Sequence, residues 1–119
     1  MWTYKELTRE EFEKTKDKVE QFIREFGGRV VDIQLPYEQK STSYSGNFIV
    51  EHTSLRPIYE LNKEYFRVDE ICFRNKPFIV IEFGSYEELM SNTMEDAGAF
   101  PYDLSERDIR NEVLEILWN

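Results

Sequence analysis

The spacing of apolar residues changes at Gly27-Gly28, and this change constrains the fold more than any other feature of the chain. Before the glycine pair, apolar residues recur at the spacing of one helix face, and these residues are Phe12, Val19, Phe22, Ile23 and Phe26. After it, the chain alternates with a period of two up to Pro36, with Val31, Ile33 and Leu35 on one side. Glycine readily takes the positive φ that ends many helices. We therefore expect a first helix followed by a strand.

Three short segments carry the pattern of a helix start, in which a hydroxyl side chain and an acid three residues later bond to each other's backbone N–H groups. Thr8-Arg9-Glu10-Glu11 predicts that the first helix begins at Arg9. Ser85-Tyr86-Glu87-Glu88 predicts a short helix, and Ser105-Glu106-Arg107-Asp108 is a weaker third instance before a final helix. The apolar face of that final helix is expected to comprise Ile109, Val113, Ile116 and Leu117.

Between the first and second helices, runs of apolar and β-branched residues predict further strands, at 47–52, 58–61, 65–73 and 78–83. No helical segment separates these runs, so the strands are expected to pair antiparallel. The run at 78–83 is nearly all apolar, which favours a place inside the sheet. Two polar stretches, Glu38 to Gly46 and Asn92 to Asp103, are expected to be loops.

These elements predict an α+β fold with an N-terminal helix, an antiparallel sheet of four to five strands, a short helix and a C-terminal helix. We expect the helices to pack on one face of the sheet. The length of 119 residues fits a single domain over 1–119, and an aromatic content of 15% argues against disorder.

Negative charge is concentrated in the last third of the chain. From Glu82 to Asn119 there are ten acids and two bases, whereas residues 1–81 hold fourteen acids and thirteen bases. The net charge of the whole chain is −9. This distribution favours a basic protein partner and disfavours nucleic acid or an anionic membrane surface.

The segment from Met94 to Asp103 is the best candidate for function, because it mixes acids with aromatic residues in an expected loop. Together with the acidic face of the last helix, it gives a predicted partner-binding set of Glu95, Asp96, Tyr102, Asp103, Glu112 and Glu115. The alternative interpretation is a packed connection, in which Phe100, Pro101 and Tyr102 fill the edge of the core and the acids are only solvated.

Most catalytic chemistry has no support in the sequence. Cys72 is the only cysteine and His52 the only histidine, so no metal ligand set, disulfide or redox pair is predicted. Phosphate-binding glycine motifs are absent, and no cofactor is predicted. The polar N-terminus predicts no secretory signal, and with the lone cysteine it favours a cytoplasmic location.

The leading functional hypothesis is a non-catalytic cytoplasmic module that masks a basic surface of another protein, such as a toxin or a nucleic-acid enzyme. An immunity protein or an inhibitor acts in this way. The alternative is a homodimeric structural or regulatory module that associates through an exposed strand or through Leu117 and Trp118. An enzyme that uses His52 with Glu51 or Glu70 is a third reading, from a different class.

Overall fold

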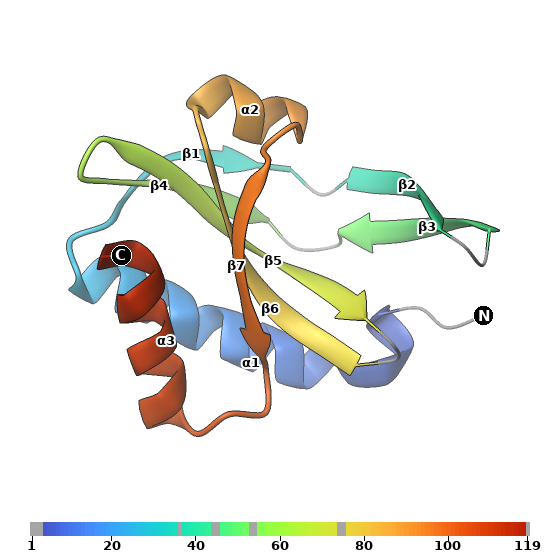
Figure 1. Ribbon diagram of the computed structural model, residues 1–119, viewed down its shortest axis with the longest axis horizontal. Coiled ribbons are helices and arrows are strands. Elements are labelled where there is room, and N and C mark those ends of the chain that lie inside the picture. The colour runs from blue at the N-terminus through green and yellow to red at the C-terminus, as the bar shows by residue number, and fades with distance from the viewer. Residues whose placement is uncertain (1–3, 36, 44–45, 53–54, 74–75, 119) are drawn as a thin grey trace.

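The computed structural model describes residues 4–35, 37–43, 46–52, 55–73 and 76–118 (Figure 1). Along the chain its elements are α1 (Tyr4–Glu25), β1 (Arg29–Gln34), β2 (Tyr37–Ser43), β3 (Gly46–His52), β4 (Arg56–Leu61), β5 (Glu64–Phe73), β6 (Lys76–Gly84), α2 (Tyr86–Ser91), β7 (Asp96–Pro101) and α3 (Glu106–Trp118). The predicted α+β arrangement is confirmed.

Five strands form an antiparallel sheet in the order β1-β4-β5-β6-β7, and β2 pairs with β3 in a separate two-stranded sheet. β4 and β5 are joined by Asn62 and Lys63, whose φ values are 53° and 67°. Two consecutive residues with positive φ make the tight turn whose twist suits a hairpin. β6 lies between β5 and β7, so its predicted interior position is confirmed.

α1 begins five residues earlier than predicted, at Tyr4 rather than at Arg9. The segment before Thr8 contains no glycine or proline, and lysine, glutamate and leucine are good helix formers, so the helix gains by extending. The end of α1 is as predicted, because Gly27 follows it with a φ of 108°. The capping box at Ser85 is also confirmed, since its hydroxyl accepts from Glu88 N and the Glu88 carboxylate accepts from Ser85 N.

Both polar stretches predicted as loops contain strands, so those two predictions are wrong. β2 occupies most of the first stretch and pairs with β3 from Tyr37↔His52 to Ser43↔Gly46. β7 occupies the second and pairs with β6 from Asp96↔Phe83 to Pro101↔Phe78. In each case the strand is formed by backbone pairing with a neighbour, which overrides the weak β propensity of glutamate and lysine in β2 and of glycine, alanine and aspartate in β7.

The two faces of the sheet carry different chemistry. On one face α1 and α3 cover an apolar core that includes Val19, Ile23, Phe66, Ile79 and Val113. Phe66 and Val68 of β5 belong to this core, so Arg67, which lies between them, points to the other face. There the Arg67 side chain meets the carbonyl of Leu89 in α2. α1 and α3 therefore share one face as predicted, whereas α2 lies against the other.

Candidate functional site

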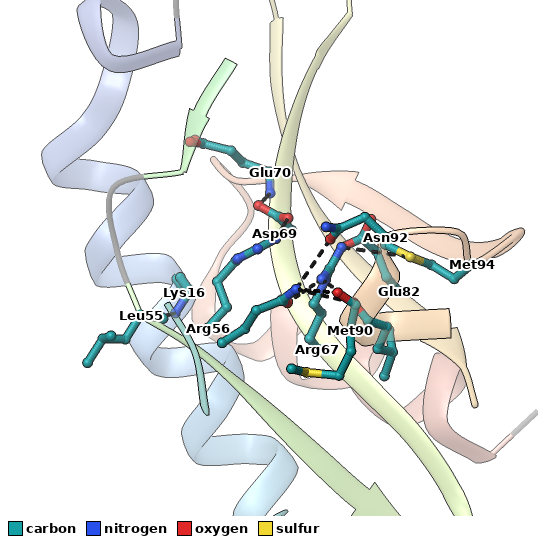
Figure 2. Close-up of polar contacts among 12 residues, drawn as sticks. Lys16, Leu55, Arg56, Arg67, Asp69, Glu70, Glu82, Met90, Asn92 and Met94 are labelled. Atoms are coloured by element: carbon teal, nitrogen blue, oxygen red, sulfur yellow. Dashed lines mark hydrogen bonds and ion pairs between the residues drawn. The ribbon is translucent and has the colours of Figure 1, made fainter. Parts of the chain in front are cut away.

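A buried ionic network holds α2 and the segment leading into β7 against the sheet (Figure 2). The Arg67 guanidinium, 1% exposed, donates to Glu82 Oε1 at 2.8 Å, to Gln34 Oε1 and to the Leu89 carbonyl at 2.9 Å. It also approaches the Met94 sulfur at 3.7 Å. One side chain thus joins β5 to β1, β6, α2 and the chain just before β7.

The network satisfies the C-terminal carbonyls of α2. Gln34 Nε2 donates to Leu89 O at 3.3 Å and to Met90 O at 3.4 Å, beside the Arg67 contact. The last carbonyls of a helix have no partners within it and carry partial negative charge, so a cation and an amide stabilise them. Gln34 was not singled out by the sequence, although it is the buried residue of β1.

The acids of this network are bound to internal bases. Arg56 Nη1 donates to Asp69 Oδ2 at 2.8 Å, and both side chains are buried. Burial, followed by repulsion from Asp69, raises the pKa of Glu82, and the Arg67 guanidinium opposes that rise. Glu82 is thereby removed from the acidic surface that the sequence suggested.

β7 is an edge strand: β6 pairs with it on one side, and on the other the described residues form no further strand of the sheet. Its middle is Ala97-Gly98-Ala99, and both alanines are exposed. A Cβ atom placed on Gly98 would lie 2.9 Å from Ile116 Cδ1, so α3 packs directly onto the middle of β7. As an edge strand, β7 presents backbone N–H and C=O groups on its outer side, and the side chains in its middle, on either face, are small.

The acidic side of α3 flanks this edge. Glu112 lies one helical turn before Ile116, so it is on the side of α3 that meets β7. The other flank of α3 faces α1, because the Arg110 guanidinium lies 5.1 Å from the centre of the Phe26 ring and 3.8 Å from Glu25. Asp108 and Glu115 neighbour Glu112 on the exposed surface of α3, at intervals of four and three residues.

The predicted binding residues lie around β7 but do not form one cluster. Glu95 and Asp96 are exposed at its start, and Asp103 is exposed just beyond its end. A strand of this length separates the two ends by roughly 20 Å, and Figure 1 shows β7 running from α2 to the connection into α3. Glu112 is half-buried and Glu115 is exposed on α3.

Tyr102 is partly packed rather than free. Its side chain contacts the apolar core, and burial, followed by the nearby Glu11 carboxylate, raises its pKa. Phe100 is a core residue at 2% exposure. The aromatic residues of the segment thus pack against the core, as the alternative interpretation expected, while Glu95, Asp96 and Asp103 stay at the surface.

A hollow of about 410 Å³ opens at the start of β7. Phe83, Gly84 and Ile116 line it together with the carboxylate residues Glu64, Glu88 and Asp96, and none of its lining residues is basic. Asp96 is the one predicted binding residue that lines this hollow. Glu64 was not singled out by the sequence, because only the folded sheet brings β5 and β7 to the same hollow.

His52 and Cys72 lie in β3 and β5, but their side chains fall outside the described residues. Within the part of the chain that the structure describes, no group of three or more histidine, cysteine, aspartate or glutamate residues is placed to hold a metal ion. Over the same residues, no helix is both long enough and apolar enough to span a membrane. Comparisons with protein-family models, curated proteins and solved structures gave no match.

Proposed function

We propose that this protein is a cytoplasmic, non-catalytic binding module that masks a basic segment of another protein, and that the segment adds as an extra strand to the outer edge of β7. The observation that carries the proposal is the exposed edge of β7 beside the acidic side of α3. An immunity protein or an inhibitor of a nucleic-acid enzyme acts by masking of this kind.

The outer edge of β7 offers the backbone hydrogen bonds from which strand addition gains its affinity. An extended segment can bond its backbone to the outer N–H and C=O groups of β7, and the small side chains of Ala97 and Ala99 leave room for it. Because successive side chains of an added strand alternate between faces, every second one lies on the α3 side, where Glu112 and Glu115 favour lysine or arginine.

The charges also favour a basic partner over a second copy at this edge. Two β7 strands paired antiparallel would bring Glu95 and Asp96 of one copy towards Asp103 of the other. Like charges opposite each other in a sheet are destabilising. The same acids disfavour nucleic acid and anionic membrane surfaces.

Affinity capture with paired charge variants tests the proposal. The tagged protein is compared with a Glu112→Lys/Glu115→Lys variant and with a Glu10→Lys/Asp17→Lys variant, which makes the same charge change on exposed positions of α1. We expect a basic protein to be recovered by the native protein and by the α1 variant, and to be lost by the α3 variant.

The captured partner is then used in hydrogen exchange, because charge attraction alone does not protect backbone amides. Strand addition is expected to slow the exchange of amides in Ala97, Gly98 and Ala99 at least tenfold. A partner that binds with equal strength to all three proteins, or that leaves the β7 amides unprotected, would overturn the proposal.

A homodimer is the second candidate, and the other edge of the sheet favours it. Three large apolar side chains in and just after β1 are exposed, namely Val30 (45%), Ile33 (49%) and Leu35 (71%). Large apolar side chains on an exposed edge strand commonly mark an interface. Sedimentation equilibrium of the native protein and of an Ile33→Lys variant separates the candidates, since only a β1 dimer would be dissociated by the substitution.

A further inference from the structure

We infer that the hollow at the start of β7 is a pocket for one arginine side chain, carried by the basic segment that pairs with β7. This inference rests on the proposed function and assigns one recognition position within it. It draws on the shape of the hollow, its apolar lining, the placement of its carboxylates and the helix end beside it.

One wall of the hollow is closely packed. Gly84 lies at the end of β6, and a Cβ there would meet Glu88 Cβ at 3.1 Å and Met94 Cβ at 3.2 Å, so α2 and the segment before β7 approach this end of β6 closely. The Glu88 carboxylate bends back to accept from Ser85 N at 3.0 Å. The remaining space is bordered by Phe83 and Ile116, which are only partly buried.

The potential in the hollow is negative from two sources. Glu64, Glu88 and Asp96 contribute carboxylates, and no lining residue offers a compensating base. Ile116 belongs to the last turn of α3, which contains no basic residue. The carbonyls at a helix C-terminus add partial negative charge there, so the site favours a cation.

The placement of the carboxylates favours a guanidinium over an ammonium. Glu64 is on β5 and Asp96 on β7, with β6 between them, and Glu64 lies two residues along β5 from the position in line with Asp96, so their backbones are separated by about 12 Å. A guanidinium presents five N–H donors in a planar fork and stacks on aromatic rings such as that of Phe83, whereas an ammonium is a compact point charge.

The position relative to β7 joins this pocket to the edge. Asp96 is both the first residue of β7 and part of the lining, so a strand paired along β7 passes beside one wall of the hollow. One side chain of that strand can enter while its backbone stays paired. The pocket thus adds a sequence requirement, an arginine at the end of the segment that lies beside Asp96.

The test uses small probes that cannot form a strand. N-acetyl-L-arginine methylamide and its lysine counterpart are titrated into the ¹⁵N-labelled protein and followed by amide chemical shifts. We expect the arginine probe to shift Gly84, Ser85 and Ile116, and to bind at least fivefold more tightly than the lysine probe.

Two variants of equal charge provide the control. Glu64→Gln/Asp96→Asn is expected to weaken the arginine probe at least tenfold, whereas Glu87→Gln/Glu95→Gln, which changes exposed acids outside the lining, leaves it unchanged. Unfolding curves show whether each variant is folded. Equal binding of the two probes, or an equal loss in both variants, overturns the inference.

Failure of this inference differs from failure of the proposed function. If the partner protects the amides of β7 while the arginine probe leaves the hollow unshifted, the pocket is wrong and strand addition stands. If the probe binds in the hollow but no partner protects β7, the pocket stands as a cation site and strand addition is wrong.

Discussion

The Arg67 guanidinium, in the middle of the sheet, donates a hydrogen bond of 2.9 Å to the carbonyl of Leu89 at the end of α2. These residues are 22 positions apart in the chain. The contact fixes the short helix that leads into β7. The position of the candidate binding edge therefore depends on a residue that lies outside it.

Removing Arg67 is expected to destabilise the protein strongly. Arg67→Ala leaves Glu82 and the Leu89 carbonyl without their cation, and breaking a buried ion pair costs about 3–5 kcal/mol. Urea unfolding measures the loss, and Arg107→Ala, at an exposed position, should stay within about 0.5 kcal/mol of the native protein. A loss at Arg67 no larger than at Arg107 would show that the network contributes little.

Gly98→Ala is expected to disturb the packing of α3 on β7. The added methyl group would lie 2.9, 3.0 and 3.2 Å from three carbon atoms of Ile116, and overpacking of this kind costs roughly 1–3 kcal/mol. Ala99→Val adds volume on the exposed face of the same strand and should be tolerated. Ile116→Val in the Gly98→Ala background should recover part of the loss, and additive losses would contradict the contact.

The loss of folding stability at acid pH should involve the Asp32 carboxyl. Tyr86 Oη donates to one Asp32 oxygen and Ile33 N to the other at 2.8 Å, and these bonds hold the pKa of the Asp32 carboxyl below its ordinary value, Tyr86 having the larger effect. A lowered folded-state pKa gives stability that is present above the unfolded pKa of about 3.9 and is lost as pH falls through the folded value.

Tyr86→Phe is accordingly expected to raise the pKa of Asp32 towards its ordinary value and to reduce the difference in stability between neutral and acid pH. A carboxyl-carbon NMR titration measures the pKa directly. Tyr102→Phe removes a hydroxyl near Glu11 instead, and should leave Asp32 unchanged. An unaltered Asp32 pKa in the Tyr86 variant would show that the Tyr86 hydroxyl does not act on the Asp32 carboxyl.

Binding of a basic partner should depend on salt through the acids of α3. Glu112→Gln/Glu115→Gln is expected to lower the association rate several-fold and to flatten its dependence on ionic strength, because exposed charges act mainly by steering the encounter. The dissociation rate should change less, since backbone pairing along β7 remains. Stopped-flow association at several salt concentrations measures both effects, with Glu10→Gln/Asp17→Gln as the matched control on α1.

The elements that the sequence predicted well are those with a local signal. The capping box at Ser85 and the change of period at Gly27 each depend on a few neighbouring residues, and both appear in the structure. β7 lacked such a signal because Ala97-Gly98-Ala99 has neither apolar alternation nor β-branched residues. Its formation depends on β6, which offers a second edge for pairing.

β1 shows a different limit of pattern reading. Its period of two was recognised, but the residue buried in it is Gln34, while Ile33 is 49% exposed. The usual preference for burying the apolar side is reversed here because Gln34 faces the Arg67 guanidinium and the last carbonyls of α2. No pattern in the residues near Gln34 in the chain predicts those partners.

The sequence by itself determined the α+β class, most of the elements and the excess of acid in the last third of the chain, because propensity, capping, periodicity and charge are local properties. Only the tertiary structure decided which acids gather at a surface. It withdrew Glu82 into a partly buried pair with Arg67, placed Glu112 beside the edge of β7 and brought Glu64 and Asp96 to one hollow. The physical reason is that strand order and helix packing set these distances, and both depend on contacts between residues far apart in the chain.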